Sequence, residues 1–178
     1  MRILAFLTLT LAPVAAFAEA ESGGTLNPEE MTIGRILEDA ENGVTSMTNC
    51  AAGYYITKAG RHVAARRLFS KCAESGYTGA MTWMSQLDDN GLGAPENPDA
   101  AAIWDQRAAE AGDPVGAYNY GLDLMRGRGT VQDVEAGRRL VDQAALAGLP
   151  TARRLQAAGY DLDEVTPDAD NWKYAPLF

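Results

Sequence analysis

Apolar side chains recur every three or four residues over most of the chain, with polar positions between them. In one segment they belong to Trp83, Met84 and Leu87, and in a second segment to Tyr120, Leu124 and Met125. Residues at this spacing share one face of an α-helix. Each segment is therefore predicted to be an amphipathic helix, and the fold is predicted to be all-α.

Glycines show that this pattern repeats every 36 residues. They mark three positions of the repeat: Gly76, Gly112 and Gly148, then Gly91 and Gly127, then Gly93 and Gly129. A period of this length is typical of solenoids, in which supersecondary units stack in a row. Because glycine readily adopts the left-handed conformation that ends a helix, the Gly-x-Gly turn is predicted to divide each unit into two helices.

The second helix of each unit has a defined start. Asn97 and Asp133 are 36 residues apart and can cap the free amides of a first helical turn. Pro98 follows Asn97 at the first helical position, where its missing N–H breaks no hydrogen bond. These helices are predicted to bury the side chains of Ala101, Ile103, Trp104, Ala108, Leu140, Val141, Ala144 and Ala145.

These positions resemble the Sel-one-like repeat, a relative of the tetratricopeptide repeat. The resemblance is carried by Ala-Glu-Ala-Gly at 109–112, the Gly-x-Gly turns, the Asp133 cap, and Trp104 five residues before Ala109. It covers residues 77–148 well and 48–76 less well. It implies a right-handed α/α solenoid of antiparallel helix hairpins with capping helices, whose first helices line a concave face that binds partners.

The solenoid is expected to have flanking segments of different kinds. Its N-terminal capping helix would open at Asn27-Pro28 and end at Gly43. The predicted segments are a signal peptide at 1–18, a flexible segment at 19–26, a solenoid at 27–159 with caps at 27–43 and 149–159 and repeats at about 44–76, 77–112 and 113–148, and an irregular acidic and aromatic tail at 160–178.

Residues 1–18 have the pattern of a secretory signal peptide. Arg2 precedes an apolar run, and Ala16-Phe17-Ala18 matches the small-x-small cleavage pattern. We expect cleavage after Ala18 and a periplasmic or secreted mature chain with no transmembrane segment. An uncleaved membrane anchor is the alternative, although the apolar run is short for a bilayer span.

The two cysteines lie on either side of a compressed turn at residues 59–61. Cys50 precedes Arg61 by 11 residues and Cys72 follows it by 11, so an antiparallel helix pair would bring them level. An even cysteine count in an exported chain favours a disulfide. The alternative is a redox or metal site, but the only histidine, His62, lies at the far end of this hairpin. We therefore predict a Cys50–Cys72 disulfide, with no metal and no cofactor.

Charge limits the class of partner. The chain holds 15 Lys and Arg against 24 Asp and Glu, and loss of Arg2 with the signal peptide would take the net charge from −9 to −10. The phosphates of a nucleic acid would be repelled by such a chain, so no nucleic-acid partner is expected.

The chain lacks the common catalytic motifs. It has no Gly-x-Ser-x-Gly, His-Glu-x-x-His or Gly-x-x-x-x-Gly-Lys motif, and no serine is followed three residues later by lysine. We expect no catalytic residue and no enzyme activity. The alternative, implied by resemblance to cysteine-rich members of the family, is a cell-wall or β-lactam-binding module with weak hydrolase activity.

The resemblance also places one row of side chains on the concave face as the candidate binding site. The row consists of Thr82, Gln86, Asp89, Tyr118, Leu122, Met125 and Arg126. Ordinary packing in the core is the alternative for each of them. The expected partner is a protein or peptide of the cell envelope, bound by a monomer that thereby regulates an envelope protein.

The tail combines acidic residues with large apolar ones, among them Trp172, Tyr174 and Phe178. Aromatic side chains of this size are unfavourable in water. The tail is therefore expected either to fold back over the open end or groove of its own solenoid, or to insert into another protein.

Overall fold

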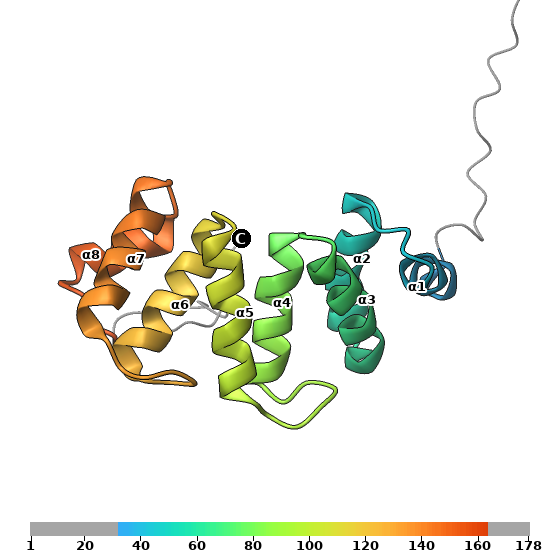
Figure 1. The fold of residues 1–178 in the computed structure, drawn as a ribbon, viewed down its shortest axis with the longest axis horizontal. Helices are drawn as coiled ribbons and strands as arrows, with labels where there is room; N and C mark the ends of the chain where they lie inside the picture. The colour runs from blue at the N-terminus through green and yellow to red at the C-terminus, as the bar shows by residue number, and fades with distance from the viewer. Residues whose placement is uncertain (1–31, 164–178) are drawn as a thin grey trace, which may run out of the picture.

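The computed structural model describes residues 32–163, which form eight α-helices and no β-strand. The helices are α1 (Ile33–Glu41), α2 (Met47–Lys58), α3 (His62–Glu74), α4 (Thr78–Asp89), α5 (Pro98–Glu110), α6 (Pro114–Arg126), α7 (Val134–Leu146) and α8 (Pro150–Ala157). Figure 1 shows them following one another along an elongated stack. The predicted signal peptide, the 19–26 segment, the predicted helix start at Asn27-Pro28 and most of the tail lie outside the described residues.

The helices pack in the order in which they occur in the chain. Each helix from α2 to α8 lies against the next one, and α1 packs on α2 and α3. Contacts between near neighbours only are the defining property of a solenoid, so the predicted all-α solenoid of helix hairpins is confirmed. Helix α4 also contacts α6 directly. Elements on the inner side of a curved stack approach one another most closely, which favours α4 and α6 as inner helices.

The second helices begin where the sequence predicts. The side chain of Asn97 accepts a hydrogen bond from the Ala100 amide at 3.1 Å, and Asp133 accepts one from the Ala136 amide at 2.9 Å. Pro98 is the first residue of α5. Each cap satisfies an amide that has no partner within the helix, which fixes the start of α5 and of α7.

The Gly-x-Gly turns join neighbouring repeats. Gly93 and Gly129 have φ angles of 76° and 64°. A Cβ atom on Gly93 would lie 2.8 Å from the Val63 amide nitrogen, and one on Gly129 would lie 2.0 Å from the Pro98 carbonyl oxygen. The turn of each repeat thus rests on the start of the preceding second helix, at a distance that only glycine permits.

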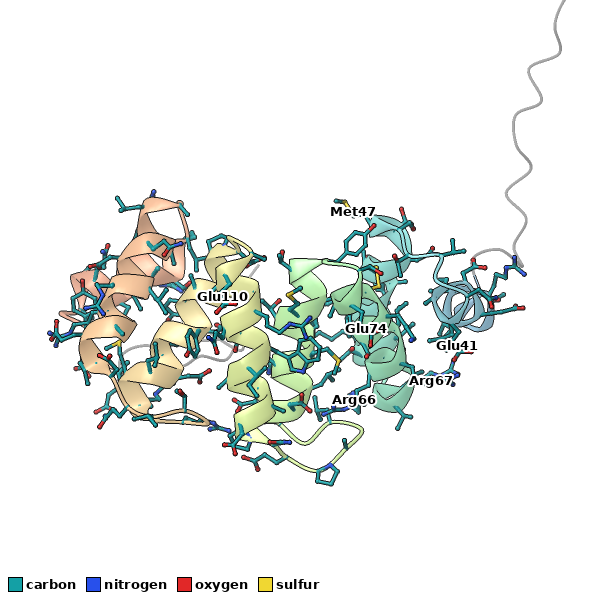
Figure 2. All side chains as sticks on the ribbon, viewed as in Figure 1. Glu41, Met47, Arg66, Arg67, Glu74 and Glu110 are labelled. Atoms are coloured by element: carbon teal, nitrogen blue, oxygen red, sulfur yellow. A yellow bond between two sulfur atoms is a disulfide. The ribbon has the colours of Figure 1, made fainter. Side chains whose placement is uncertain are left out.

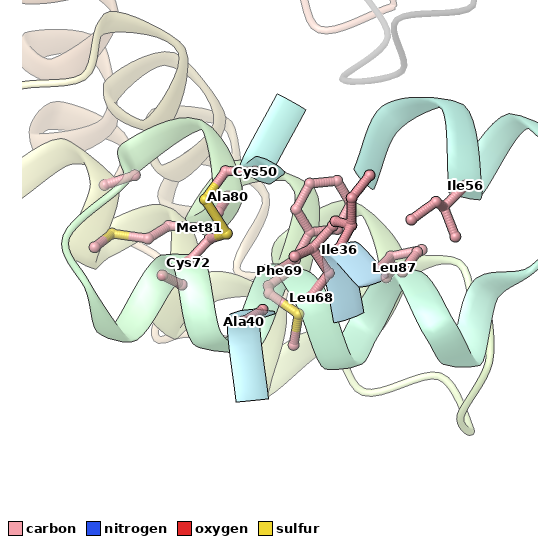
Figure 3. Close-up of a cluster of buried hydrophobic side chains, with 14 residues drawn as sticks. Ile36, Ala40, Cys50, Ile56, Leu68, Phe69, Cys72, Ala80, Met81 and Leu87 are labelled. Atoms are coloured by element: carbon pink, nitrogen blue, oxygen red, sulfur yellow. A yellow bond between two sulfur atoms is a disulfide. The ribbon is translucent and has the colours of Figure 1, made fainter. Parts of the chain in front are cut away.

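A disulfide lies in the core of the N-terminal half of the stack. Cys50 on α2 and Cys72 on α3 are bonded, with their Cα atoms 5.8 Å apart, and both are buried. Figure 3 shows the bond beside Met81 and Ala80 of α4. The predicted pairing is confirmed, and the disulfide ties the first hairpin together where the next helix packs on it.

Helix α1 closes this end of the stack. Its Ile36 and Ala40 side chains are buried in the same core cluster as the disulfide. On the surface, Glu41 pairs with Arg67 of α3, and Figure 2 shows the two side chains meeting between these helices. Apolar burial therefore holds α1 in place, because an exposed ion pair contributes little.

One predicted core residue lies elsewhere. The Ile103 side chain is 56% exposed, whereas its neighbours Ala101 and Ala102 and the more distant Ala108 are buried. Helix α5 packs between α4 and α6 with small side chains, and Ile103 falls on its solvent side, so the prediction for Ile103 is wrong. None of the helices between residues 32 and 163 has the length and apolar character that a bilayer span requires.

Candidate functional site

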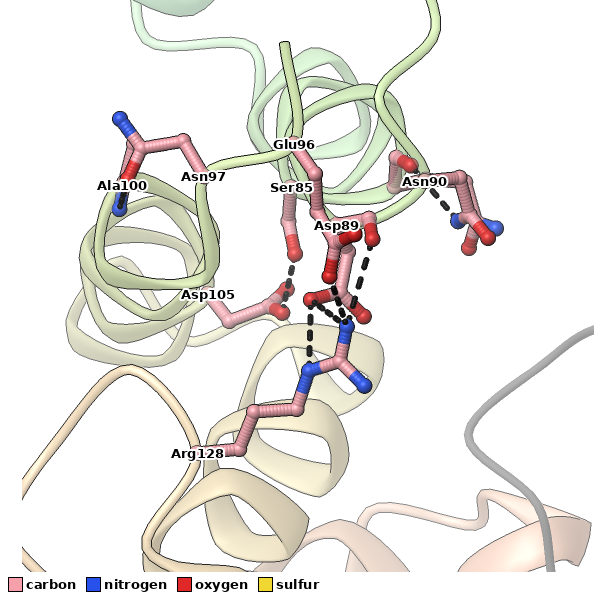
Figure 4. Close-up of polar contacts among 9 residues, drawn as sticks. Ser85, Asp89, Asn90, Glu96, Asn97, Ala100, Asp105 and Arg128 are labelled. Atoms are coloured by element: carbon pink, nitrogen blue, oxygen red, sulfur yellow. Dashed lines mark hydrogen bonds and ion pairs between the residues drawn. The ribbon is translucent and has the colours of Figure 1, made fainter.

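Three residues from three helices form a hydrogen-bonded group, called here the polar trio, at the centre of the stack. Ser85 on α4 and Asp105 on α5 are buried, and Asn119 on α6 is half-buried. Ser85 Oγ donates to Asp105 Oδ2 at 2.5 Å, and Asn119 Nδ2 donates to Asp105 Oδ1 at 3.3 Å. Figure 4 shows the Ser85 and Asp105 side chains pointing toward each other between α4 and α5. Each carboxyl oxygen of Asp105 therefore has a partner on a neighbouring helix.

The same three positions are apolar in the preceding repeat. Phe69 and Trp83 stand 36 residues before the aspartate and the asparagine of the trio, and their rings are stacked with centroids 5.7 Å apart. Gly53 stands in the place of the serine, and a Cβ atom there would come within 2.4 Å of the Phe69 ring. This glycine lets the phenylalanine ring lie directly against α2.

The following repeat is apolar as well. Its equivalent residues, 36 positions after the trio, are Gly121, Val141 and Leu155. A Cβ atom on Gly121 would lie 3.1 Å from Val141 Cγ2, and both Val141 and Leu155 are completely buried in one cluster. The same packing site thus occurs in three consecutive repeats, and only the middle repeat fills it with polar side chains.

Two further carboxyl groups approach the trio from α4 and α6. Burial raises the pKa of Asp105 well above its usual value, the hydrogen bond from Ser85 opposes this, and the negative charges of Asp123 and Asp89 add to it. Burial also raises the pKa of Asp123 to about 7, assisted by Asp89 and opposed by Arg128 and Arg126. Nearby like charges and desolvation both favour the neutral acid. The face of α4 and α6 around the trio is therefore acidic, with a group that titrates near neutral pH.

Arg128 borders this acidic surface. Its guanidinium group lies 2.9 Å from an oxygen of Asp89 and 3.3 Å from an oxygen of Glu96. Figure 4 shows Arg128 reaching from the turn after α6 to the end of α4. The turn after α6 is thus linked to the turn after α4 at this edge of the two first helices.

The structure divides the residues of the predicted binding row into two groups. Thr82, Gln86 and Asp89 on α4 and Arg126 on α6 are partly exposed. The other three, Tyr118, Leu122 and Met125, are 4%, 0% and 4% exposed and belong to the core cluster shared with α7 and α8. Because their side chains face the rest of the stack, these three are corrected to packing residues.

The sequence prediction missed the polar trio and Asp123. The signal was present in the repeat itself, because Asp105 stands between Phe69 and Val141 at the 36-residue period. Likewise Asp123 stands 36 residues after Leu87, which is completely buried. Within residues 32–163, no three or more His, Cys, Asp or Glu side chains are grouped in a way that could hold a metal ion.

No protein-family model and no curated protein sequence matches this chain. Several solved structures resemble it, among them the three that follow. A Sel1 repeat protein from Oxalobacter formigenes aligns with a TM-score of 0.63 at 18% identity, over 79% of this chain and 58% of the other. Cysteine-rich protein B of Helicobacter pylori aligns with a TM-score of 0.58 at 18% identity, over 75% of this chain and 98% of the other.

The third structure is a protective antigen of uropathogenic Escherichia coli with a Sel-one-like repeat fold. It aligns with a TM-score of 0.52 at 21% identity, over 77% of this chain and 35% of the other. This chain thus spans 58% and 35% of the length of the first and third structures. The similarities establish that it has the Sel-one-like repeat fold, so the predicted resemblance is confirmed for the fold.

Proposed function

We propose that this protein is a periplasmic or secreted helical-repeat scaffold that binds a protein or peptide of the cell envelope through the face of α4 and α6, and thereby regulates that partner. The observation that carries the proposal is the polar trio. Burying polar groups is less favourable than burying apolar ones of similar shape. Both neighbouring repeats pack with apolar side chains at these positions, so stacking alone does not require Ser85, Asp105 and Asn119.

The surroundings of the trio support recognition of a polar or basic segment. Asp89 and Asp123 lie close enough to raise the pKa of Asp105, and both are only partly buried. A lysine or arginine side chain of a bound peptide would reduce the repulsion between these carboxylates. Charge-assisted hydrogen bonds of this kind are stronger than neutral ones and fix the orientation of a ligand.

The fold and the disulfide support the remaining parts of the proposal. Stacked helical repeats supply extended surfaces that bind proteins without further chemistry. A buried disulfide between α2 and α3 suits a chain that folds in an oxidising compartment. Both observations favour a non-enzymatic scaffold outside the cytoplasm.

The proposal is tested by photo-crosslinking in the host's envelope. p-Benzoylphenylalanine replaces Gln86, which is partly exposed on α4, and in a control it replaces Gln143, which is exposed on α7. One envelope protein captured from position 86 but not from position 143, and lost in an Asp123→Arg variant, is the expected result. Equal capture from both positions, or capture that Asp123→Arg does not change, would contradict the proposed face.

A further inference from the structure

Helix α2 exposes aromatic side chains beside α4. Tyr54 and Tyr55 are 42% and 73% exposed. The Tyr54 ring lies edge-on to Tyr55 and to the half-buried Trp83 of α4, with ring centroids 5.3 Å and 5.6 Å away. The ammonium group of Lys58 lies over the Tyr54 ring, 5.7 Å from its centroid. These four side chains are called here the aromatic patch.

The stacking of the repeats does not account for this patch. Tyr54 follows Gly53 as Gln86 follows Ser85, so the next repeat has a polar side chain at the same place. Aromatic side chains are unfavourable in water and are enriched in protein interfaces. The exposed rings therefore indicate a surface that another molecule covers.

We propose that the aromatic patch binds a proline-rich stretch of the partner in the polyproline II conformation. Rings arranged edge to face leave shallow notches between them, and proline-rich segments dock into aromatic-lined grooves of this kind. The segment adopts its bound conformation before binding, so little conformational entropy is lost.

The hydrogen-bonding groups of the patch favour the same occupant. They are the hydroxyls of both tyrosines, the indole N–H of Trp83 and the ammonium group of Lys58, all of which can donate. A polyproline II segment has no internal hydrogen bonds, so its carbonyl groups remain free to accept. Proline itself offers no backbone N–H that would need an acceptor. Donors on the protein thus meet acceptors on the peptide.

The patch adjoins the face assigned to the partner above, and in this respect the inference rests on the proposed function. Gln86 of that face lies three residues after Trp83 and is its neighbour on the surface of α4. One extended segment can therefore contact both. A polyproline II segment rises about 3.1 Å per residue and packed helices lie about 8–10 Å apart, so about three residues span the distance from one helix to the next.

Charge fixes the direction of the segment. The only charged group of the patch is the ammonium group of Lys58, which repels a basic side chain. The acidic surface around Asp123 attracts one. The basic residue of the segment therefore lies over α4 and α6, and its prolines lie over α2.

The test is an NMR titration of the purified ¹⁵N-labelled mature chain, residues 19–178, with the synthetic peptide Lys-Ala-Ala-Pro-Pro-Ala-Pro-Pro. We expect shift changes at the amides of Tyr54 and Tyr55 and at the indole N–H of Trp83. Replacing every proline of the peptide by glycine should weaken binding about tenfold, because a flexible chain loses more conformational entropy. Equal binding of the glycine peptide, or shift changes confined to α4 and α6, would overturn the proposal and leave the proposed function standing.

Two exposed side chains of the first hairpin provide matched variants. Tyr55→Ala removes a ring that is mostly in solvent, so the fold is retained, and it should weaken binding of the proline peptide about tenfold. Val63→Ala shortens an exposed side chain of α3 and should leave binding unchanged. If Tyr55→Ala binds the peptide as tightly as the unaltered chain does, the patch is not its site.

Two further measurements separate the patch from the acidic face and from self-association. Replacing the lysine of the peptide by glutamate should weaken binding through the acidic face. Equal binding of these two peptides would contradict that part of the proposed function while supporting the patch. Shift changes at Tyr54 and Tyr55 that follow protein concentration without peptide would show a second copy on the patch and overturn the proposal.

Discussion

The first hairpin and the middle of the stack solve the same packing problem with opposite chemistry. Where α2, α3 and α4 meet, Gly53 makes room for the Phe69 ring, which stacks on Trp83. Where α4, α5 and α6 meet, the equivalent positions hold the polar trio, in which hydrogen bonds replace ring contacts. The same backbone arrangement accommodates apolar and polar side chains at these positions. The fold therefore does not dictate which kind of side chain they hold.

The difference also has an energetic side. Close-packed rings gain dispersion and hydrophobic free energy, whereas hydrogen bonds between buried polar groups gain less, because they replace hydrogen bonds to water. The first hairpin is further constrained by the disulfide, and the described residues contain no second one. The N-terminal part of the stack is therefore expected to be its more stable part.

The largest expected effect follows from removing the apolar packing of the first hairpin. Phe69→Ala should lower the free energy of unfolding by about 3–5 kcal/mol, because it leaves a cavity against Gly53 and removes the stack on Trp83. Chemical denaturation followed by circular dichroism measures the change. Val63→Ala, at an exposed position of the same helix, is the control and should change stability by less than about 0.5 kcal/mol.

The disulfide gives the next largest effect. It closes a loop with a sequence separation of 22 residues. Replacing both cysteines by alanine should destabilise the chain by about 3 kcal/mol in the loop-entropy description. Differential scanning calorimetry of oxidised and reduced protein checks this. If the melting temperature stays the same after reduction, the disulfide does not stabilise the fold.

Converting the middle of the stack to the apolar arrangement should have a smaller effect of opposite sign. The triple variant Ser85→Gly, Asp105→Val and Asn119→Leu copies the residues of the following repeat. It should raise the free energy of unfolding by about 1–2 kcal/mol, since apolar replacement of a buried polar group is often stabilising. Loss of partner capture in this more stable variant would assign the trio to recognition, while a loss of stability would contradict our account of the comparison.

The last prediction concerns the change of stability with pH. Burial raises the pKa of Asp123 to about 7, so the folded chain holds this proton at pH values where the unfolded chain has released it. Stability should therefore be greatest below about pH 4 as far as this group is concerned, and fall as the pH rises toward 7, by at most about 1.4 kcal/mol per pH unit. Asp123→Asn should flatten this slope in urea titrations at pH 5, 6 and 7. An unchanged slope would show that Asp123 titrates normally.

Much of the fold could be predicted from the sequence because its signals are local or periodic. The caps at Asn97 and Asp133 depend on a few adjacent residues, and the Cys50–Cys72 pairing follows from a helix pair folding at one turn. It is harder to predict from the sequence which face of a helix packs against the neighbouring helices. Tyr118, Leu122 and Met125 were assigned to a binding face through the resemblance, although their apolar character suits the core where they lie.

The polar trio could not be predicted in the same way. A lone aspartate such as Asp105 on a helix is usually solvent-exposed, and its burial becomes apparent only when the repeats are compared at their period. Its hydrogen-bond partners come from two other helices, 20 and 14 residues away in sequence. Sequence spacing gives the faces of each helix but not the way in which three helices meet.

The Gly-x-Gly turns have a consequence for how such a chain can be lengthened. The second glycine of each turn fits against the start of the second helix of the previous repeat, Gly93 on Val63 and Gly129 on Pro98. The joint therefore belongs to two consecutive repeats and recurs with the 36-residue period. An in-frame duplication of 36 residues would therefore add a further joint of the same kind. Adding whole repeats, by gene duplication or by protein engineering, is thus the way of lengthening the chain that preserves these contacts.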